Sequence, residues 1–402
     1  MTRLEWSGRA EAEQVCWAAE IGGVDGQFPV IRQIDRGRMI CQDNLLVLRE
    51  FLKSPQERFH FIYIDPPYNT GTRRGKGLAY NDRLGQNSSE AWLSMIYPRL
   101  VLSREVLLDR GIICVSIDER EHAHLMVLLS EIYGRENHIV TIKWRKKRKP
   151  SFLSSHASSV FEYIVVFAKN ARILPRLRGK AARELSRPVL NAGNPWAERI
   201  IRRGTAAKCG DGILQPGRRA VRTLSFELLD ALEVKNGAVL GDCRVRGPFR
   251  VSQEVIDQTV FVTKNWGLRR SVGADELGFQ HFTDDGSDWP TNEDGDQEIL
   301  QLYGTRVFPF AKPVSMLLHL IEMYPIAEKD MHFLDFFAGS GSFGEAVMRA
   351  NALDGLKRRF TLVQIPEEYV NAAVPNISNL FELMCDRISR CYGTKLAGHC
   401  TI

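Results

Sequence analysis

The sequence lacks several features that would define a membrane, secreted or metal-binding protein. No stretch approaches the roughly 18 uninterrupted apolar residues of a membrane-spanning helix, and the start, MTRLEWSGRAEAEQ, has no apolar signal-peptide region. The eight cysteines form no CxxC pair, which argues against a disulfide framework. Cys209 and Cys243 are too few for a zinc site. These absences predict a cytoplasmic protein with no metal and no membrane partner.

What is present is an ordinary globular composition with an uneven distribution of charge. The chain has 402 residues, enough for two or three structural units, and 44% of them are hydrophobic. The net charge is only +6, but residues 143–220 hold 19 Lys or Arg against 4 acids. Such a basic block favours a polyanionic partner. Residues 271–300 hold 9 acids and no Lys or Arg, so they form either a solvated face or a counter-charge to that block.

Short apolar runs alternate with helical patterns along much of the chain. The runs expected to be buried strands of a parallel sheet are Met39–Cys41, Phe59–Ile64, Gly111–Ile117, Ile139–Trp144, Phe161–Ala168, Phe333–Phe337 and Phe360–Ile365. Helical spacing is found at Leu45–Leu52, Glu90–Leu108 and Phe343–Ala350, and at Val314, Leu317, Leu318 and Ile321. This alternation predicts a doubly wound α/β sheet. Residues 171–304 break it with Gly- and Pro-rich stretches, which indicates an inserted domain.

A first motif, Asp65-Pro66-Pro67-Tyr68, follows directly after an apolar strand. Ligands of open α/β sheets bind at the carboxyl ends of strands, so the position suggests a site. The two prolines have no N–H donors, which leaves backbone carbonyls and the Asp65 carboxylate as acceptors for an –NH2 group. Tyr68 offers a flat face for a planar ring.

A second motif runs from Asp335 to Ser342, DFFAGSGS, at the end of another apolar strand. Its glycines, Gly339 and Gly341, allow the backbone to approach a ligand closely. No GK[ST] follows, which disfavours a P-loop nucleotide hydrolase, and the full G-x-G-x-x-G of a dinucleotide site is absent.

The two motifs together resemble those of the β-class DNA amino-methyltransferases, which use S-adenosylmethionine. The catalytic motif precedes the cofactor loop by some 270 residues, the order typical of this circularly permuted class. Further segments of the family are resembled by Lys312-Pro313, by Gln42–Leu46 and by Phe161–Asn170. The segment Val363–Glu367 is similar to one found in the modification subunits of type III restriction systems. Gln364 stands where many relatives carry an acid.

The resemblance implies a Rossmann-like methyltransferase fold with a mostly parallel seven-stranded sheet. It divides the chain into an N-terminal extension (1–30), a catalytic half (31–170), a target-recognition insert (171–304) and a cofactor-binding half (305–402). The two motif strands should then lie in one sheet. The implied catalytic residues are Asp65, Pro66, Pro67 and Tyr68, and the implied cofactor-binding residues are Asp43, Lys312, Pro313, Asp335, Phe337, Ala338, Gly339, Gly341, Gln364 and Glu367.

The implied reaction is methylation of N6 of an adenine that has flipped out of duplex DNA. The basic run Lys143, Arg145, Lys146, Lys147, Arg148 and Lys149 is expected to contact phosphates. Three alternatives stay open: N4 methylation of cytosine, methylation of RNA, and nucleic-acid binding on an inactive scaffold. A homodimer and a restriction subunit are both compatible with the resemblance, and the sequence decides neither.

Overall fold

The computed structural model forms two compact units, residues 1–177 with 283–402, and residues 178–282. It describes residues 3–17, 30–69, 89–150, 157–179, 186–221, 224–271, 282–308, 311–326, 328, 330–368, 374 and 377–395. The second unit lies inside the expected insert 171–304 but is narrower. Residues 283–304 belong to the first unit because β17 (Asp285–Gly286) pairs with β5 (His138–Arg145).

The larger unit is built on one nine-stranded sheet. Its strands are β1 (Val30–Ile34), β2 (Gly37–Cys41), β3 (Phe59–Ile64), β4 (Leu107–Ile117), β5, β6 (Phe161–Ala168), β17, β18 (His332–Asp335) and β19 (Arg359–Gln364). They lie in the order β1-β2-β19-β18-β3-β4-β6-β5-β17. All seven strands expected from the apolar runs are present in it.

The seven central strands are β2, β19, β18, β3, β4, β6 and β5, and all of them except β6 run parallel to one another. This strand pairs antiparallel with both β4 and β5, so the expectation that Phe161–Ala168 joins a parallel sheet was wrong in direction. β6 lies between β4 and β5 and is mostly buried, so its apolar run does not indicate in which direction the strand runs. The remaining two strands, β1 and β17, lie at the edges of the sheet. The central part is therefore a mostly parallel sheet of seven strands, as expected for the α/β methyltransferase-like fold class.

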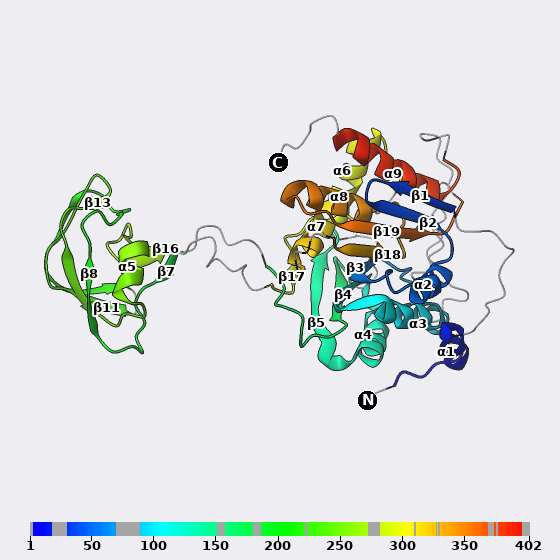
Figure 1. Cartoon of the computed structure of the whole chain (residues 1–402), viewed down its shortest axis with the longest axis horizontal. Coiled ribbons are helices and arrows are strands. Elements are labelled where there is room, and N and C mark those ends of the chain that lie inside the picture. Colours follow the sequence, from blue (N-terminus) through cyan, green and yellow to red (C-terminus); the bar gives the residue numbers. More distant parts are fainter. Residues whose placement is uncertain are drawn as a thin grey trace. The chain divides into compact units, whose positions relative to one another are not determined.

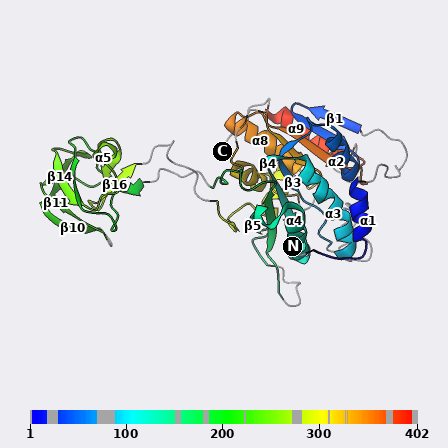
Figure 2. The same cartoon turned by 60° about the horizontal axis from the view of Figure 1, so that its bottom comes forward.

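Helices cover both faces of this sheet (Figures 1 and 2). One layer holds α2 (Asn44–Lys53), α3 (Ser89–Val106) and α4 (Glu119–Tyr133), and the other holds α7 (Val314–Met323), α8 (Ser342–Asp354) and α9 (Leu380–Lys395). The helix α6 (Asn292–Tyr303) packs beside α7 and α9. The first layer and the sheet share a core that includes Trp92, Leu100 and Phe336. Strands covered on both sides explain why β3 and β18 are buried along almost their whole length.

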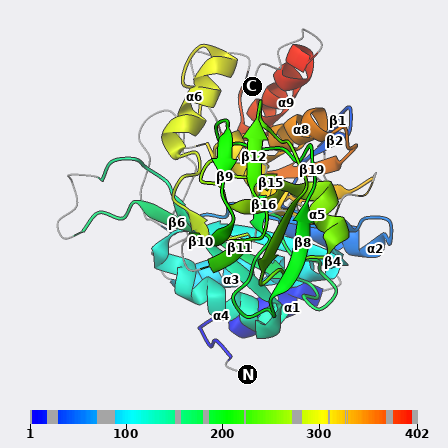
Figure 3. The same cartoon turned by 90° about the vertical axis from the view of Figure 1, so that its left-hand side faces the viewer.

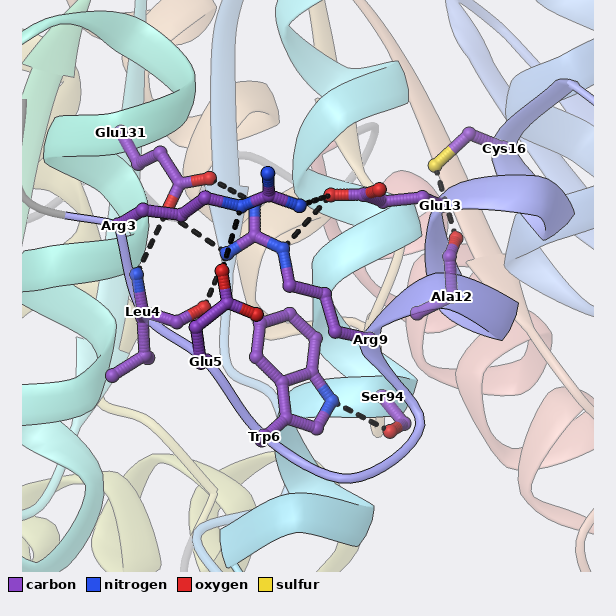
Figure 4. A network of polar contacts seen from close by, with 10 residues as sticks. All are labelled: Arg3, Leu4, Glu5, Trp6, Arg9, Ala12, Glu13, Cys16, Ser94 and Glu131. Carbon is purple, nitrogen blue, oxygen red and sulfur yellow. Dashed lines mark hydrogen bonds and ion pairs between the residues drawn. The ribbon is translucent and has the colours of Figure 1, made fainter.

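The N-terminal residues that the structure describes, 3–17, pack against the larger unit. The helix α1 (Arg9–Trp17) packs on α3, and Figure 4 shows how polar contacts hold it. Arg9 pairs with Glu131 of α4 and with Glu13, and its guanidinium lies over the ring of Trp6. The Trp6 indole in turn donates to Ser94 Oγ over 2.9 Å. This segment is therefore tied to the helix layer by a buried cation.

The second unit consists of small antiparallel sheets (Figure 3). Their strands are β7 (Ser186–Pro188), β8 (Ala197–Ile201), β9 (Gly212–Leu214), β10 (Gly217–Val221), β11 (Leu224–Leu228), β12 (Leu232–Lys235), β13 (Ala238–Val239), β14 (Cys243–Gly247), β15 (Val260–Val262) and β16 (Leu268–Ser271), with the helix α5 (Gln253–Thr259). Side chains of β12 and β14 alternate strictly between buried and exposed, the pattern of strands with one wet face. The inward residues, such as Ile201, Phe226 and Val245, form the unit's own core.

Within the described residues, no helix combines the length and the hydropathy needed to cross a bilayer. The same residues contain no group of three or more His, Cys, Asp or Glu side chains placed to hold a metal ion.

Candidate active site

The two motifs of the sequence end neighbouring strands of one sheet. β3 and β18 are parallel and directly paired, with Ile62 opposite Leu334. Asp65 follows β3 and the glycine loop follows β18, so both leave the sheet at the same carboxyl edge. This confirms the expectation that the motif strands share a sheet although some 270 residues separate them. Such an edge is where open α/β sheets bind ligands.

Asp65 has one carboxylate oxygen fixed and one free. Its Oδ1 accepts a hydrogen bond from the Tyr68 hydroxyl over 2.6 Å and lies 3.1 Å from the Lys312 ammonium. Its Oδ2 has no partner among the described residues, and the same is true of the Pro66 carbonyl. The next carbonyl, that of Pro67, accepts from the buried Trp92 indole over 2.7 Å, which pins the turn. The motif therefore presents two open acceptors on a fixed loop.

Lys312 belongs with this catalytic motif. Its Nζ donates to the Tyr68 hydroxyl over 2.7 Å and lies 3.1 Å from Glu162 Oε2. It also faces the rings of Tyr68 and Trp144, at 4.9 Å and 5.4 Å from their centroids. The resemblance implies a cofactor contact for Lys312, which stays a prediction, and the described contacts place its ammonium beside Asp65. Pro313 precedes α7 as its N-cap residue.

Glu162 is the buried carboxylate of this site that the sequence analysis missed. It lies in β6 and is only 5% exposed. Its oxygens contact Lys312 and Lys146, the latter over 3.2 Å, and Oε2 also lies 3.3 Å from the Tyr68 hydroxyl oxygen. A charged residue inside the run FEYIVVFA was the available signal, because a buried carboxylate needs charged partners.

Burial and charge act in opposite directions on these groups. Burial raises the pKa of Asp65, and the nearby Lys312 ammonium and Tyr68 hydroxyl oppose that rise. Burial by itself would also raise the pKa of Glu162, but Lys312 and Lys146 hold it below its usual value. The two carboxylates outweigh the effect of burial on Lys312 and raise its pKa. Glu162 and Lys312 are therefore kept ionised as a buried pair.

The basic run does not act as one exposed surface. Lys146 points inward to Glu162, and Arg148 pairs with Asp294 at the start of α6. In the part of the chain that the structure describes, the ammonium groups of Lys143, Lys147 and Lys149 have no acidic partner. Lys143 and Lys149 are exposed and Lys147 is half-buried, and the exposed Arg145 guanidinium lies 6.0 Å from the Phe161 ring.

The described part of the acidic segment supplies counter-charges and helix caps. Asp294 both caps α6 and pairs with Arg148. Asp296 pairs with Arg306, and the Glu298 carboxylate accepts from the first two backbone N–H groups of α7. Residues 272–281 of that segment lie outside the described residues.

The glycine loop adopts a conformation that its glycines permit. Gly339 and Gly341 have φ values of 53° and 83°, in the left-handed region. A Cβ on Gly341 would lie 2.9 Å from Met384 Cγ, whereas open space surrounds the corresponding position at Gly339. Asp335 Oδ1 accepts from the Phe337 N–H over 2.9 Å, and Ala338 N–H bonds to the Val363 carbonyl. The loop therefore leads into α8 with backbone N–H groups at a helix N-terminus.

A buried arginine holds this loop from behind, and the sequence analysis missed it. Arg387 of α9 is 1% exposed and donates to Ser340 Oγ over 3.0 Å and to Ser342 Oγ over 2.8 Å. Its Nε lies 2.7 Å from Glu345 Oε2, and Glu345 also pairs with Arg349. The predicted motif stopped at Ser342, and no local pattern links it to a helix some 45 residues further on.

Other residues expected to bind a cofactor serve partly as supports. Gln364 Oε1 accepts from the Gly339 N–H over 2.8 Å, so this side chain fixes the loop. Asp43 caps α2 by accepting from Leu45 N–H, and it lies 3.2 Å from the Arg99 guanidinium. Arg99 also donates to Asn44, whose amide donates to the Phe336 carbonyl. This chain of contacts ties α2 to the glycine loop.

Glu367 remains available for a ligand just beyond β19. Its Oε2 is buried and has no hydrogen-bond partner among the described residues. Burial raises the pKa of Glu367 to about 7. Such an orphaned acceptor, three residues after the Gln364 that bonds to Gly339, fits a ligand that brings hydroxyl groups, as the ribose of S-adenosylmethionine would. The hydrogen-bonding groups at this edge of the sheet therefore fit that cofactor.

Comparison with known proteins identifies the family. The StyLTI Mod subunit of a type III restriction-modification enzyme from Salmonella typhimurium is 30% identical over 378 residues, which is 87% of this chain and 56% of that relative. The type II methyltransferase M.KpnI of Klebsiella pneumoniae is 27% identical over 80% of this chain and 79% of its own length. This chain thus spans just over half of the StyLTI subunit.

A solved structure, the M1.HpyAVI–SAM complex, aligns over 88% of this chain and 98% of its own, but at 10% identity and a TM-score of 0.40 it is too distant to add to the assignment. The family model described as "DNA methylase", which covers N6 and N4 methyltransferases, matches residues 59–375. That span includes both motifs and far more than half of the sequence. The chain therefore belongs to the N6/N4 DNA methylase family.

Proposed function

We propose that this chain is a site-specific DNA methyltransferase that transfers a methyl group from S-adenosylmethionine to N6 of an adenine. The observation that carries the proposal is the open pair of acceptors, Asp65 Oδ2 and the Pro66 carbonyl, beside a glycine loop at the same sheet edge. An exocyclic amine has two hydrogens, and these two acceptors match them. Asp65 as the first residue of the motif favours adenine by family resemblance.

Each residue of the motif has a distinct task in this mechanism. Asp65 and the Pro66 carbonyl hold the amine so that its lone pair, otherwise delocalised into the ring, points away from them. Tyr68 supplies a face for the flipped-out base, and its hydroxyl, fixed by Asp65 and Lys312, sets the orientation of that face. S-adenosylmethionine supplies an activated methyl group on a sulfonium. Catalysis then rests on position and on preorganised charge.

The raised pKa of Asp65 suits the last step. An amine that Asp65 and the Pro66 carbonyl hold for methylation would give up one proton in the reaction. Of the two open acceptors only Asp65 Oδ2 can take that proton, and burial makes this carboxylate a better base than an exposed aspartate.

Duplex DNA is the proposed substrate, contacted by both units. Residues 178–282 hold 18 Lys or Arg against 11 acids, and we assign target recognition to this unit. Lys143, Arg145, Lys147 and Lys149 contribute phosphate contacts from the larger unit. The name of the StyLTI relative supports a restriction subunit as a further partner, whereas a homodimer stays a prediction.

The direct test uses purified protein, DNA and S-adenosylmethionine with a tritiated methyl group. Label in N6-methyladenine after digestion to nucleosides supports the proposal. Label in N4-methylcytosine would replace the target base and keep the reaction class. A protein that binds DNA and transfers no label to DNA or RNA would be a binding protein on an inactive scaffold.

A further inference from the structure

Four buried or half-buried charged groups form one cluster behind the open acceptors. Lys312 contacts Asp65 and Glu162 at 3.1 Å each, and Lys146 contacts Glu162 at 3.2 Å. The side chains of Lys312 and Glu162 are 9% and 7% exposed, so water screens them little. Two ammonium groups face two carboxylates, so these four side chains are neutral as a whole, and the Asp118 carboxylate acts on Lys146 and Glu162 from a longer distance.

The methyl transfer places a further positive charge next to this cluster. The amine must lie within a hydrogen bond of Asp65, about 2.9 Å, and the methyl group that it attacks within about 3–3.5 Å of the amine. Because Lys312 contacts Asp65 Oδ1 at 3.1 Å and the amine takes Oδ2, the sulfonium lies within roughly 13 Å of the Lys312 ammonium. Two cations at that distance repel, unless a carboxylate compensates for one of them.

We propose that Glu162 is an electrostatic positioning residue that neutralises Lys312 and Lys146, so that the pocket accepts the cationic cofactor while Lys312 still orients Tyr68 and Asp65. This inference rests on the proposed function. Without Glu162, the Lys312 ammonium would keep Asp65 as its only ion-pair partner among the described residues, and Lys146 would keep only the longer-range attraction of Asp118. The cluster would then carry one net positive charge.

An electrostatic role of Glu162 can be distinguished from a purely structural role by comparing the affinities of two ligands. S-adenosylhomocysteine differs from the cofactor by one methyl group and has a neutral thioether sulfur. A residue that only shapes the pocket affects both ligands alike. A residue that balances charge affects S-adenosylmethionine selectively, because only that ligand brings the sulfonium.

The test is titration calorimetry of both ligands with the full chain and its variants. Glu162→Gln is expected to weaken S-adenosylmethionine by roughly fivefold to tenfold relative to S-adenosylhomocysteine, the effect of one charge at about 12–15 Å and an effective dielectric constant of about 20. Lys146→Gln added to Glu162→Gln removes the extra positive charge and is expected to restore most of the affinity ratio.

Glu57→Gln is the matched control. Glu57 is also ion-paired, with Arg38 at 2.7 Å, but it precedes β3 at the opposite edge of the sheet and is expected to leave the ratio unchanged. Equal weakening of both ligands by Glu162→Gln, or no recovery in the double variant, would overturn the inference. If Glu162→Gln does not fold, Lys146→Gln alone is the test. This variant leaves the cluster with one net negative charge, so it must raise the affinity for S-adenosylmethionine relative to S-adenosylhomocysteine. A wild-type chain that binds neither ligand would contradict the proposed function itself.

Discussion

Removing the Arg387 guanidinium tests whether α9 holds the glycine loop in place. In Arg387→Met, the hydroxyls of Ser340 and Ser342 each lose a donor, and Glu345 keeps Arg349 as its one charged partner among the described residues. Breaking a buried ion pair by removing one partner costs about 3–5 kcal/mol. Arg349 is 43% exposed and compensates for part of this charge, so we expect the lower end, about 3 kcal/mol.

Urea unfolding of the full chain, followed by far-UV circular dichroism, measures this loss. The transition in which helix is lost reports on the larger unit, since the described part of the smaller unit contains only the short helix α5. We also expect weaker binding of S-adenosylmethionine, because the loop that leads into α8 loses its support.

The double variant Arg387→Met with Glu345→Gln is the control for an unpaired buried charge. It is expected to recover most of the stability but little of the affinity, because the hydroxyls of Ser340 and Ser342 still lack the guanidinium and keep only their mutual 3.5 Å contact. A loss below about 1 kcal/mol in Arg387→Met, the net value of one ordinary hydrogen bond, would refute the reasoning.

Three further predictions follow from the site. Asp65→Asn should lower the rate of methyl transfer at saturating cofactor by at least about a hundredfold, and it should weaken S-adenosylmethionine more than S-adenosylhomocysteine, since it too leaves a positive charge. Replacing Lys147 and Lys149 by Gln should reduce the slope of log K for DNA against log salt by up to about 1.8, whereas Lys146→Gln should leave the slope unchanged, because Lys146 is bound to Glu162. The pKa of Glu367 is raised by burial from 4.5 to about 7, so the folded state binds more protons between these values and loses stability as the pH rises through that window. Glu367→Gln should remove this dependence in unfolding experiments between pH 4.5 and 8, and an unchanged profile would contradict it.

The elements of the sheet could be predicted because their cause is local. A strand covered by helices on both faces is apolar along its length, and β3 and β6 were predicted with the bounds that the structure shows. Their order and the direction of β6 depend on pairing across the sheet, to which an apolar run contributes no information. The smaller compact unit is narrower than the predicted insert for a similar reason, since residues 283–304 join the larger unit through a two-residue strand and α6.

The site itself was predicted in its motifs and missed in its supports. Asp65 and Gly339 stand in recognisable local patterns, whereas Glu162 and Arg387 act on them from segments about 97 and 48 residues away. Lys146 belonged to a run of basic residues, and composition alone could not separate its inward side chain from the exposed Lys149. Long-range ion pairs of this kind are visible only once the fold brings the segments together.

The most direct test of the central claim is sequencing, with detection of modified bases, of genomic DNA from cells that express the chain. The account predicts N6-methyladenine at every copy of one short sequence in cells with the wild-type protein. Cells with Asp65→Asn should show unmodified adenine at those positions. Undiminished methylation with Asp65→Asn, or no modified base with the wild type, would contradict the assignment of Asp65 and its neighbours to amine methylation.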